Sequence, residues 1–181
     1  MTLPVQLGLS RRHVLRGALA AMVAAGLDAP RKAMAALAAP AGQVVLTLSG
    51  QVADTNSDGV AEFDLAMLDA LPQRETVTAT PWHEGRPTFS GPTIASVLRA
   101  VGAQGSKLRI VALNDYSAEM PVEDAQTIPV ILATRIDGKT ISIRDKGPLF
   151  VIYPFDEQPE LFNEVYFGRS VWQVARIEVI A

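Results

Sequence analysis

The sequence predicts an α+β domain built on a mixed β-sheet with a few short helices. Several short runs rich in β-branched and apolar residues are separated by turn residues, whereas only two segments show a helical pattern. One unbroken apolar run, Leu149–Tyr153, has the composition of a strand that is buried on both faces in the middle of a sheet. The 181 residues are 49% hydrophobic and 19% charged, which suits a single domain with a sizeable core.

The first 38 residues are expected to be separate from this domain. Ser10–Arg16 contains paired arginines, and a weakly apolar, alanine-rich run from Gly17 to Leu27 follows, which is the layout of a twin-arginine secretory leader. The run is too short to span a bilayer, which takes about 20 apolar residues. We therefore expect residues 1–38 to be a twin-arginine signal peptide, cleaved or retained, and residues 39–181 to be a domain exported to the periplasm.

Composition excludes several classes of site. The chain has no cysteine, and His83 is the only histidine outside residues 1–38. Disulfides, thiolate metal ligands and cysteine nucleophiles are therefore excluded, and zinc, haem and iron–sulfur sites lack their usual ligands. Five of the sixteen cations lie in residues 1–38 against one carboxylate, so the remaining chain is more acidic than the overall net charge of −3. We expect no nucleic-acid partner for such a domain.

The first half of the domain is predicted to contain two strands and two helices. Alternating apolar and hydroxyl residues predict strands over Val44–Ser49 and Glu75–Thr80. Between them, Asp64 is expected to cap a helix over Leu65–Leu71 that the following proline ends. An apolar stripe at helical spacing predicts a second helix over Thr93–Val101.

An acidic loop in this half resembles part of a calcium site. Asp54–Gly59 copies the first half of an EF-hand loop, but Leu65 stands where the loop requires a bidentate glutamate. An Asx-rich turn is therefore favoured over a calcium site.

The second half is predicted to consist mainly of strands. They are expected over Lys107–Leu113, Val130–Ile136, Thr140–Ile143, Leu149–Tyr153 and Ser170–Ile180. Asp137 and Gly138 predict a tight hairpin between the second and third, because glycine tolerates positive φ. Trp172 has apolar neighbours at alternate positions and is expected in the core. The acidic segment from Asp156 to Glu164 is expected to be a loop, either simply solvated or a surface for a partner.

Polar and aromatic residues gather where these strands are expected to end, and they are the candidates for a site that binds a small polar molecule. The set is Trp82, His83, Asn114, Asp115, Tyr116, Arg144, Asp145, Lys146 and Tyr153. If the strands share a sheet, several of these ends are expected to line one cleft. A charged turn at residues 144–146, directly before the most buried strand, suits a rigid site, although buried strands need polar turns in any case.

Each candidate has a structural alternative. Trp82 is either a stacking platform for a planar ring or a rim residue that covers the core. His83 forms an acid/base pair with Glu84, or it is an exposed loop histidine. Asn114 and its neighbouring aspartate either bind the donor edge of a heterocycle or form a polar turn. Arg144 and the nearby lysine either hold an anion or pair with local carboxylates.

Three segments, Thr78–Trp82, Thr88–Pro92 and Arg144–Pro154, resemble the molybdopterin-binding domain of the sulfite oxidase superfamily. That family shows a Cys-x-x-x-Trp strand end, an aromatic-x-Gly step into a helix, and a turn before a proline and an apolar strand. The resemblance covers most of the chain after the expected leader, from about Val44 to Val179, and implies the sulfite oxidase-like fold. It also places Thr78 where the family has the cysteine that ligates molybdenum.

A hydroxyl is a far poorer ligand for this metal than a thiolate. The chain therefore resembles more closely a branch without that cysteine, the periplasmic pterin-binding proteins of the PruR type. This resemblance implies a non-catalytic protein that binds a reduced pterin and regulates a membrane-bound signalling protein, with a periplasmic domain, that makes and degrades cyclic di-GMP.

The resemblance also implies roles for individual residues. It adds Thr78 to the candidate ligand-binding set, with Trp82 or Tyr116 stacking on the pterin and Asp115 or Asp145 accepting hydrogen bonds from its amino group. Two alternatives remain. One is a molybdopterin-dependent oxidoreductase of the sulfite oxidase superfamily, and the other is a structural periplasmic domain with an empty pocket.

Overall fold

The computed structural model describes residue 2 and residues 37–181. The predicted signal peptide over residues 1–38 lies almost wholly outside the described residues and stays a prediction. In the described part of the chain, no helix is both long enough and apolar enough to cross a membrane.

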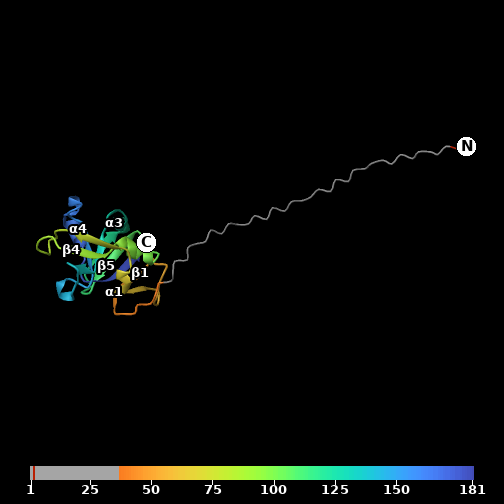
Figure 1. Cartoon of the computed structure of the whole chain (residues 1–181), viewed down its shortest axis with the longest axis horizontal. Coiled ribbons are helices and arrows are strands. Elements are labelled where there is room, and N and C mark those ends of the chain that lie inside the picture. Colours follow the sequence, from red (N-terminus) through yellow and green to blue (C-terminus); the bar gives the residue numbers. More distant parts are fainter. Residues whose placement is uncertain (1, 3–36) are drawn as a thin grey trace. The chain divides into compact units, whose positions relative to one another are not determined.

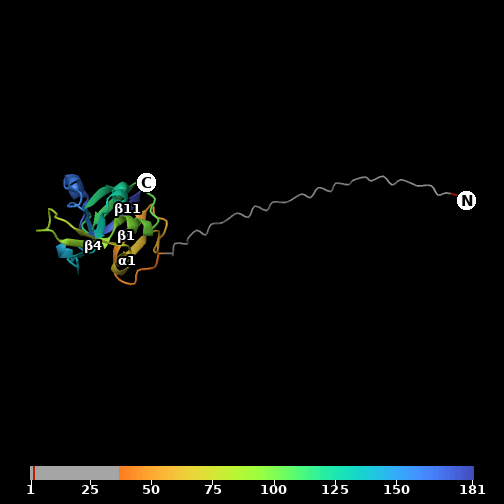
Figure 2. The ribbon, with the colours of Figure 1, turned by 45° about the horizontal axis from the view of Figure 1, so that its top comes forward.

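The main sheet is mixed, as the sequence predicts. Its five strands lie in the order β2-β1-β11-β5-β6. Their bounds are Val44–Gly50 for β1, Ala61–Asp64 for β2, Lys107–Ala112 for β5, Ser117–Pro121 for β6 and Val174–Ile180 for β11. The chain's first and last strands, β1 and β11, run parallel side by side, and every other neighbouring pair is antiparallel (Figures 1 and 2). The described residues thus confirm the α+β class.

Two smaller sheets complete the described part of the domain. One has the order β3-β4-β8-β9, and β10 pairs with β7 in the other. Their bounds are Gln73–Val77 for β3, Thr88–Pro92 for β4, Ile131–Ala133 for β7, Arg135–Ile136 for β8, Lys139–Thr140 for β9 and Phe150–Ile152 for β10. The predicted hairpin is confirmed between β8 and β9, where Asp137 and Gly138 both have positive φ.

Some predicted strand limits are wrong. The strand after the hairpin ends at Thr140 instead of Ile143, because Ser142 caps a 3₁₀ turn that begins at Ile143. The strand predicted over Glu75–Thr80 starts earlier and ends at Val77. The threonine hydroxyls that follow it bond to loop groups, so this part of the chain leaves the sheet.

The helices are short. Their bounds are Leu65–Asp69 for α1, Ile94–Ala100 for α2, Val122–Thr127 for α3 and Glu164–Arg169 for α4, with 3₁₀ turns η1 at Ile143–Asp145 and η2 at Pro159–Leu161. Both predicted helices, α1 and α2, are confirmed within a residue or two of their expected limits. Helix α4 was not predicted, and it forms part of the site described below.

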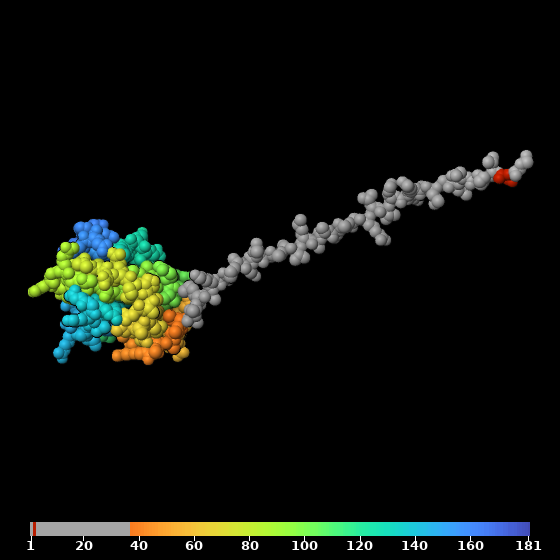
Figure 3. Space-filling view, in the orientation of Figure 1, coloured from red at the N-terminus to blue at the C-terminus, as the bar shows by residue number. Residues whose placement is uncertain are grey.

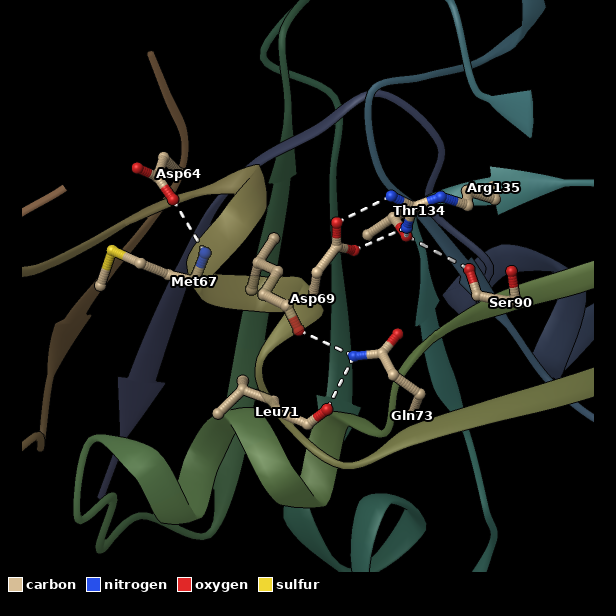
Figure 4. A network of polar contacts seen from close by, with 9 residues as sticks. Asp64, Met67, Asp69, Leu71, Gln73, Ser90, Thr134 and Arg135 are labelled. Atoms are coloured by element: carbon tan, nitrogen blue, oxygen red, sulfur yellow. Dashed lines mark hydrogen bonds and ion pairs between the residues drawn. The ribbon is translucent and has the colours of Figure 1, made fainter. Parts of the chain in front are cut away.

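A polar network holds α1 in place (Figure 4). The Asp64 carboxylate accepts a hydrogen bond from the Met67 N–H at 2.8 Å, which confirms the predicted cap. At the other end, both carboxylate oxygens of Asp69 accept from the Arg135 guanidinium, at 2.6 and 2.7 Å. Gln73 donates to two carbonyls at the end of the helix. These contacts fix α1 to β8 and to the start of β3.

The apolar run around β10 is buried on both faces, as predicted. Val151 packs in a larger core under the main sheet, whereas Phe150 and Ile152 point the other way into a smaller core with Phe89 and Ile131. The strand is not in the middle of a sheet, however. It pairs with β7 on one side and makes a single bridge to Trp172 on the other, so burial comes from the two cores.

Candidate functional site

A cavity of about 350 Å³ lies where the loop after β3, the end of β5, the start of β6 and helix α4 meet. Its size is within the range of sites for small organic ligands. The residues that matter most for binding are Trp82, Asn114, Tyr116, Glu164, Phe167 and Trp172. Three of them, Trp82, Asn114 and Tyr116, belong to the set chosen from the sequence.

Aromatic rings form the walls. The rings of Trp82 and Trp172 are 5.7 Å apart between centroids, and those of Trp82 and Phe167 are 5.9 Å apart, both in edge-to-face contact. Tyr116 is half exposed, and its hydroxyl donates to the Gly168 carbonyl at 3.3 Å. The rings are thus held by one another while remaining accessible, which suits a flat ligand.

Trp172 does not lie in the core, so that prediction is wrong. It is 38% exposed and contributes to the cavity. Strand β11 starts only at Val174, because Gln173 has a φ of 53° and its N–H bonds to the Lys146 carbonyl. The alternation of strand side chains therefore does not extend back to Trp172.

Polar groups at the cavity come from two elements. Asn114 follows β5, and its side-chain oxygen accepts from the Tyr116 N–H at 3.1 Å. Glu164 is the first residue of α4, and its exposed carboxylate makes no ion pair with any described residue. No lysine or arginine lines the cavity. An acceptor carboxylate and an amide beside aromatic walls favour a ligand with N–H donors over an anionic ligand.

Helix α4 contributes residues that the sequence analysis missed. Its side of the cavity consists of Glu164, Phe167 and Gly168, at the i, i+3 and i+4 spacing of one helix face. The acidic segment that ends at Glu164 was expected to be a loop, and no helix was predicted after it. One local signal was present, since Asn163 directly before Glu164 is a capping pattern, and the Asn163 side chain accepts from the Val165 N–H.

Two predicted site residues are fully buried away from this cavity. The Thr78 hydroxyl donates to the Ala79 carbonyl at 3.2 Å and accepts from the Asp156 N–H at 3.1 Å. The Tyr153 hydroxyl donates to Asp124 at 2.8 Å, and burial together with that carboxylate raises its pKa far above the usual value of 10.0. Both hydroxyls are already engaged by protein groups.

The remaining candidates lie on the surface outside the cavity lining. Asp115 is 81% exposed at its side chain and pairs with Arg176 at 2.8 Å. Arg144 and Asp145 are exposed in η1, where the Ser142 hydroxyl donates to the Asp145 carboxylate. The structure thus does not place the charged turn at residues 144–146 with the three residues in the cavity.

His83 is set apart from the cavity. Its ring packs at 5.4 Å from Phe89 and 5.9 Å from Phe150, and its Nδ1 lies 3.0 Å from the Thr80 hydroxyl. Burial, and then the positive charge of Lys146, lower the pKa of His83 below the usual 6.5. The imidazole is therefore neutral at neutral pH.

The residues do not fit thiolate-bound molybdenum. The chain has no cysteine, and the buried hydroxyl of Thr78, the residue that the resemblance places at the metal-ligand position, is already engaged by the Ala79 carbonyl and the Asp156 N–H. Among residues 37–181, no group of three His, Asp or Glu side chains is arranged to hold a metal ion. This includes the acidic loop at Asp54–Gly59, which had been weighed as a calcium site.

Known proteins resemble this chain in structure but not detectably in sequence. No protein-family model and no curated protein matches the sequence. Among solved structures, the chain is similar to the sulfane dehydrogenase SoxCD from Paracoccus pantotrophus, with a TM-score of 0.56 and 15% identity over 75% of this chain. The two proteins share a fold. This likeness confirms the predicted sulfite oxidase-like fold, but the chain covers only 37% of that protein, and the identity is too low to carry over its activity.

Proposed function

We propose that this domain is an exported, non-catalytic pterin-binding protein that regulates a membrane-bound cyclic di-GMP enzyme. The observation that carries the proposal is the cavity, which combines accessible aromatic walls with the carboxylate of Glu164 and the amide of Asn114. The twin-arginine pattern supports export, and the resemblance to PruR-type proteins supports the signalling role.

The chemistry of a pterin matches this cavity. A pterin is a flat bicycle, so its faces suit the rings of Trp82, Tyr116 and Trp172. Its aminopyrimidinone edge presents two adjacent N–H donors, and a carboxylate accepts such a pair in a bidentate manner. We assign to Glu164, which lines the cavity, the role that the resemblance implied for Asp115 or Asp145.

Specificity follows from the charges. An anionic phosphate tail would find no lysine or arginine in the cavity lining to neutralise it. A pterin with a neutral side chain needs no such cation. The cavity therefore favours a simple reduced pterin over molybdopterin.

The main alternative is a molybdopterin-dependent oxidoreductase, which the shared fold with a sulfane dehydrogenase favours. Against it stand the missing cysteine and the engaged hydroxyl of Thr78. A structural domain with an empty pocket is a weaker candidate, because it does not account for an exposed Trp172 beside the partly buried Trp82 at one cavity.

Mass spectrometry tests the proposal directly. The full chain is purified from the periplasm without oxygen, so that a reduced pterin survives, and released small molecules and molybdenum are measured. We expect a pterin without a dithiolene group and no stoichiometric molybdenum. Molybdopterin or stoichiometric molybdenum would establish the alternative. No released ligand, together with no binding of added tetrahydrobiopterin, would indicate a structural domain.

A further inference from the structure

A second concave surface adjoins helix α4. It is a shallow groove of about 650 Å³, lined by Ala79, Arg86, Phe155, Asp156, Pro159 and Phe162. The groove is thus formed by the loop after β3 on one side and by the segment that leads into α4 on the other. In Figure 3 this segment, in blue, reaches the surface beside the yellow-green loop.

The groove has a rigid aromatic side chain at its edge. Phe162 is 50% exposed, yet its ring packs against Phe167 at 4.9 Å and against Phe155 at 5.7 Å. Val165, on the next turn of chain, is 58% exposed. An apolar anchor that is already held in place loses little conformational entropy on binding, which is the property of interface hot spots.

The surface around this anchor is negative. Two carboxylates of the segment are neutralised, since Asp156 pairs with Arg86 at 2.6 Å and Glu157 pairs with Arg74 at 2.7 Å. Glu160 is different, because it forms no ion pair with any residue of the described chain, and the same holds for Glu164 four residues later. A partner that buries Phe162 therefore gains from cations beside its own apolar side chain.

The groove is physically connected to the cavity. Phe162 at the groove contacts Phe167, and Phe167 contacts Trp82 in the cavity wall, at centroid distances of 4.9 and 5.9 Å. Protein interiors are close-packed, so a ligand that moves the Trp82 ring must be accommodated by its neighbours. This chain of three rings is a direct route by which occupancy of the cavity can bias the groove.

We infer that the groove, together with Phe162 and Val165, docks a segment of a partner protein that presents lysine or arginine next to an apolar or aromatic side chain. Occupancy of the cavity alters the affinity of this docking through Phe167. The coupling rests on the proposed pterin function, whereas the docking itself does not.

Random 12-residue peptides displayed on phage and panned against the full chain provide the probe. Enriched peptides are expected to combine lysine or arginine with an aromatic or aliphatic residue. A synthetic copy is expected to bind Glu160→Lys about 10-fold more weakly than the wild type and Val165→Ser more weakly as well. Asp58→Lys is the matched control, because Asp58 is an exposed carboxylate that forms no ion pair with the described residues and lies on a turn that does not line the groove.

Three results would overturn the docking surface. The first is that panning enriches no peptide over wells without protein, and the second is that it enriches acidic peptides. The third is that Glu160→Lys and Asp58→Lys lose equal affinity for the synthetic peptide. Pterin binding is measured on the same samples by tryptophan fluorescence with tetrahydrobiopterin. If peptides bind through Glu160 but the pterin does not bind, the docking stands and the proposed function fails. If the pterin binds and peptides do not, the docking alone fails. If both bind, but tetrahydrobiopterin does not change the affinity of the protein for the peptide and the peptide does not change its affinity for tetrahydrobiopterin, the coupling is wrong.

Discussion

Replacing Glu164 by glutamine is the sharpest test of the cavity. The change keeps the size of the side chain but removes the charge that is proposed to accept two N–H donors. Hydrogen bonds to a charged group are worth about 1.5–3 kcal/mol and neutral ones about 0.5–1.5 kcal/mol. Glutamine keeps only one acceptor oxygen and its NH2 would face the second donor, so the expected loss is at least about 1.5 kcal/mol, which corresponds to a Kd for tetrahydrobiopterin raised at least about 13-fold.

The protein carries its own reporter for this measurement. Trp82 and Trp172 are the two tryptophans of the chain, and both line the cavity. Quenching of their fluorescence in an oxygen-free titration therefore gives the Kd. Glu160→Gln is the matched control, because it makes the same charge change four residues earlier, in the 3₁₀ turn η2 and outside the cavity lining.

Stability must be followed in parallel. Glu164 lies in the first turn of α4, where a carboxylate favours the helix, so thermal unfolding is measured to show that the variant is folded at the titration temperature. An unchanged Kd for Glu164→Gln, or the same change for Glu160→Gln, would refute the proposed contact.

Three further predictions concern the aromatic wall, an ion-pair network and pH. Trp172→Ala should raise the Kd for tetrahydrobiopterin at least 5-fold, since stacking on a ring is worth about 1–3 kcal/mol; an unaffected Kd would remove Trp172 from the site. The variant should also lower Tm, because most of the side chain is buried and its ring packs against Trp82 and Phe150, so the Kd is measured well below the Tm of the variant. Asp124→Ala leaves the buried Tyr153 hydroxyl and Arg169 without their acceptor and should cost about 3 kcal/mol in urea unfolding, whereas Asp115→Ala, which breaks an exposed pair of the same 2.8 Å length, should cost under about 1 kcal/mol. Similar losses for the two would contradict this argument. The folded state lowers the pKa of His83, so the unfolded chain binds its proton at higher pH, and stability should fall as pH drops below 6.5 toward the folded pKa. As pH drops below 6.5, the Tm of His83→Gln should fall less steeply than the Tm of the wild type. NMR titration of His83 should give a pKa below 6.5; a pKa above 6.5 would mean that protonation of His83 stabilises the fold, which contradicts the prediction.

The fold was predictable to a large extent because its signals are local. The capping carboxylate of Asp64, the Asp137-Gly138 turn and the apolar stripe of α2 each depend on residues a few positions apart, and all three are confirmed. The apolar run around β10 is buried on both faces for the same reason, since its composition has no polar side chain to expose. The α+β class then followed from the order of these segments, whereas the sulfite oxidase-like fold was expected from the resemblance of three segments to that superfamily.

The site was predictable only in part. Trp82, Asn114 and Tyr116 were chosen as a stacking ring and polar strand ends, and they do meet at one cavity. Asp115 is adjacent to two of these in sequence, but it has a φ of 63° and pairs with Arg176 on the surface. Because Asp115 has a left-handed backbone conformation, its side chain lies outside the cavity lining, although its neighbours Asn114 and Tyr116 line the cavity.

What the sequence determined by itself is the class of fold and one exclusion. The absence of cysteine removes thiolate chemistry however the chain folds. Only the tertiary structure decided that Glu164 lines the cavity, that the Tyr153 hydroxyl donates its hydrogen bond to Asp124 and that Trp172 is exposed. These facts depend on contacts between segments distant in sequence, and the pattern along one strand or helix does not specify which neighbour its exposed face will meet.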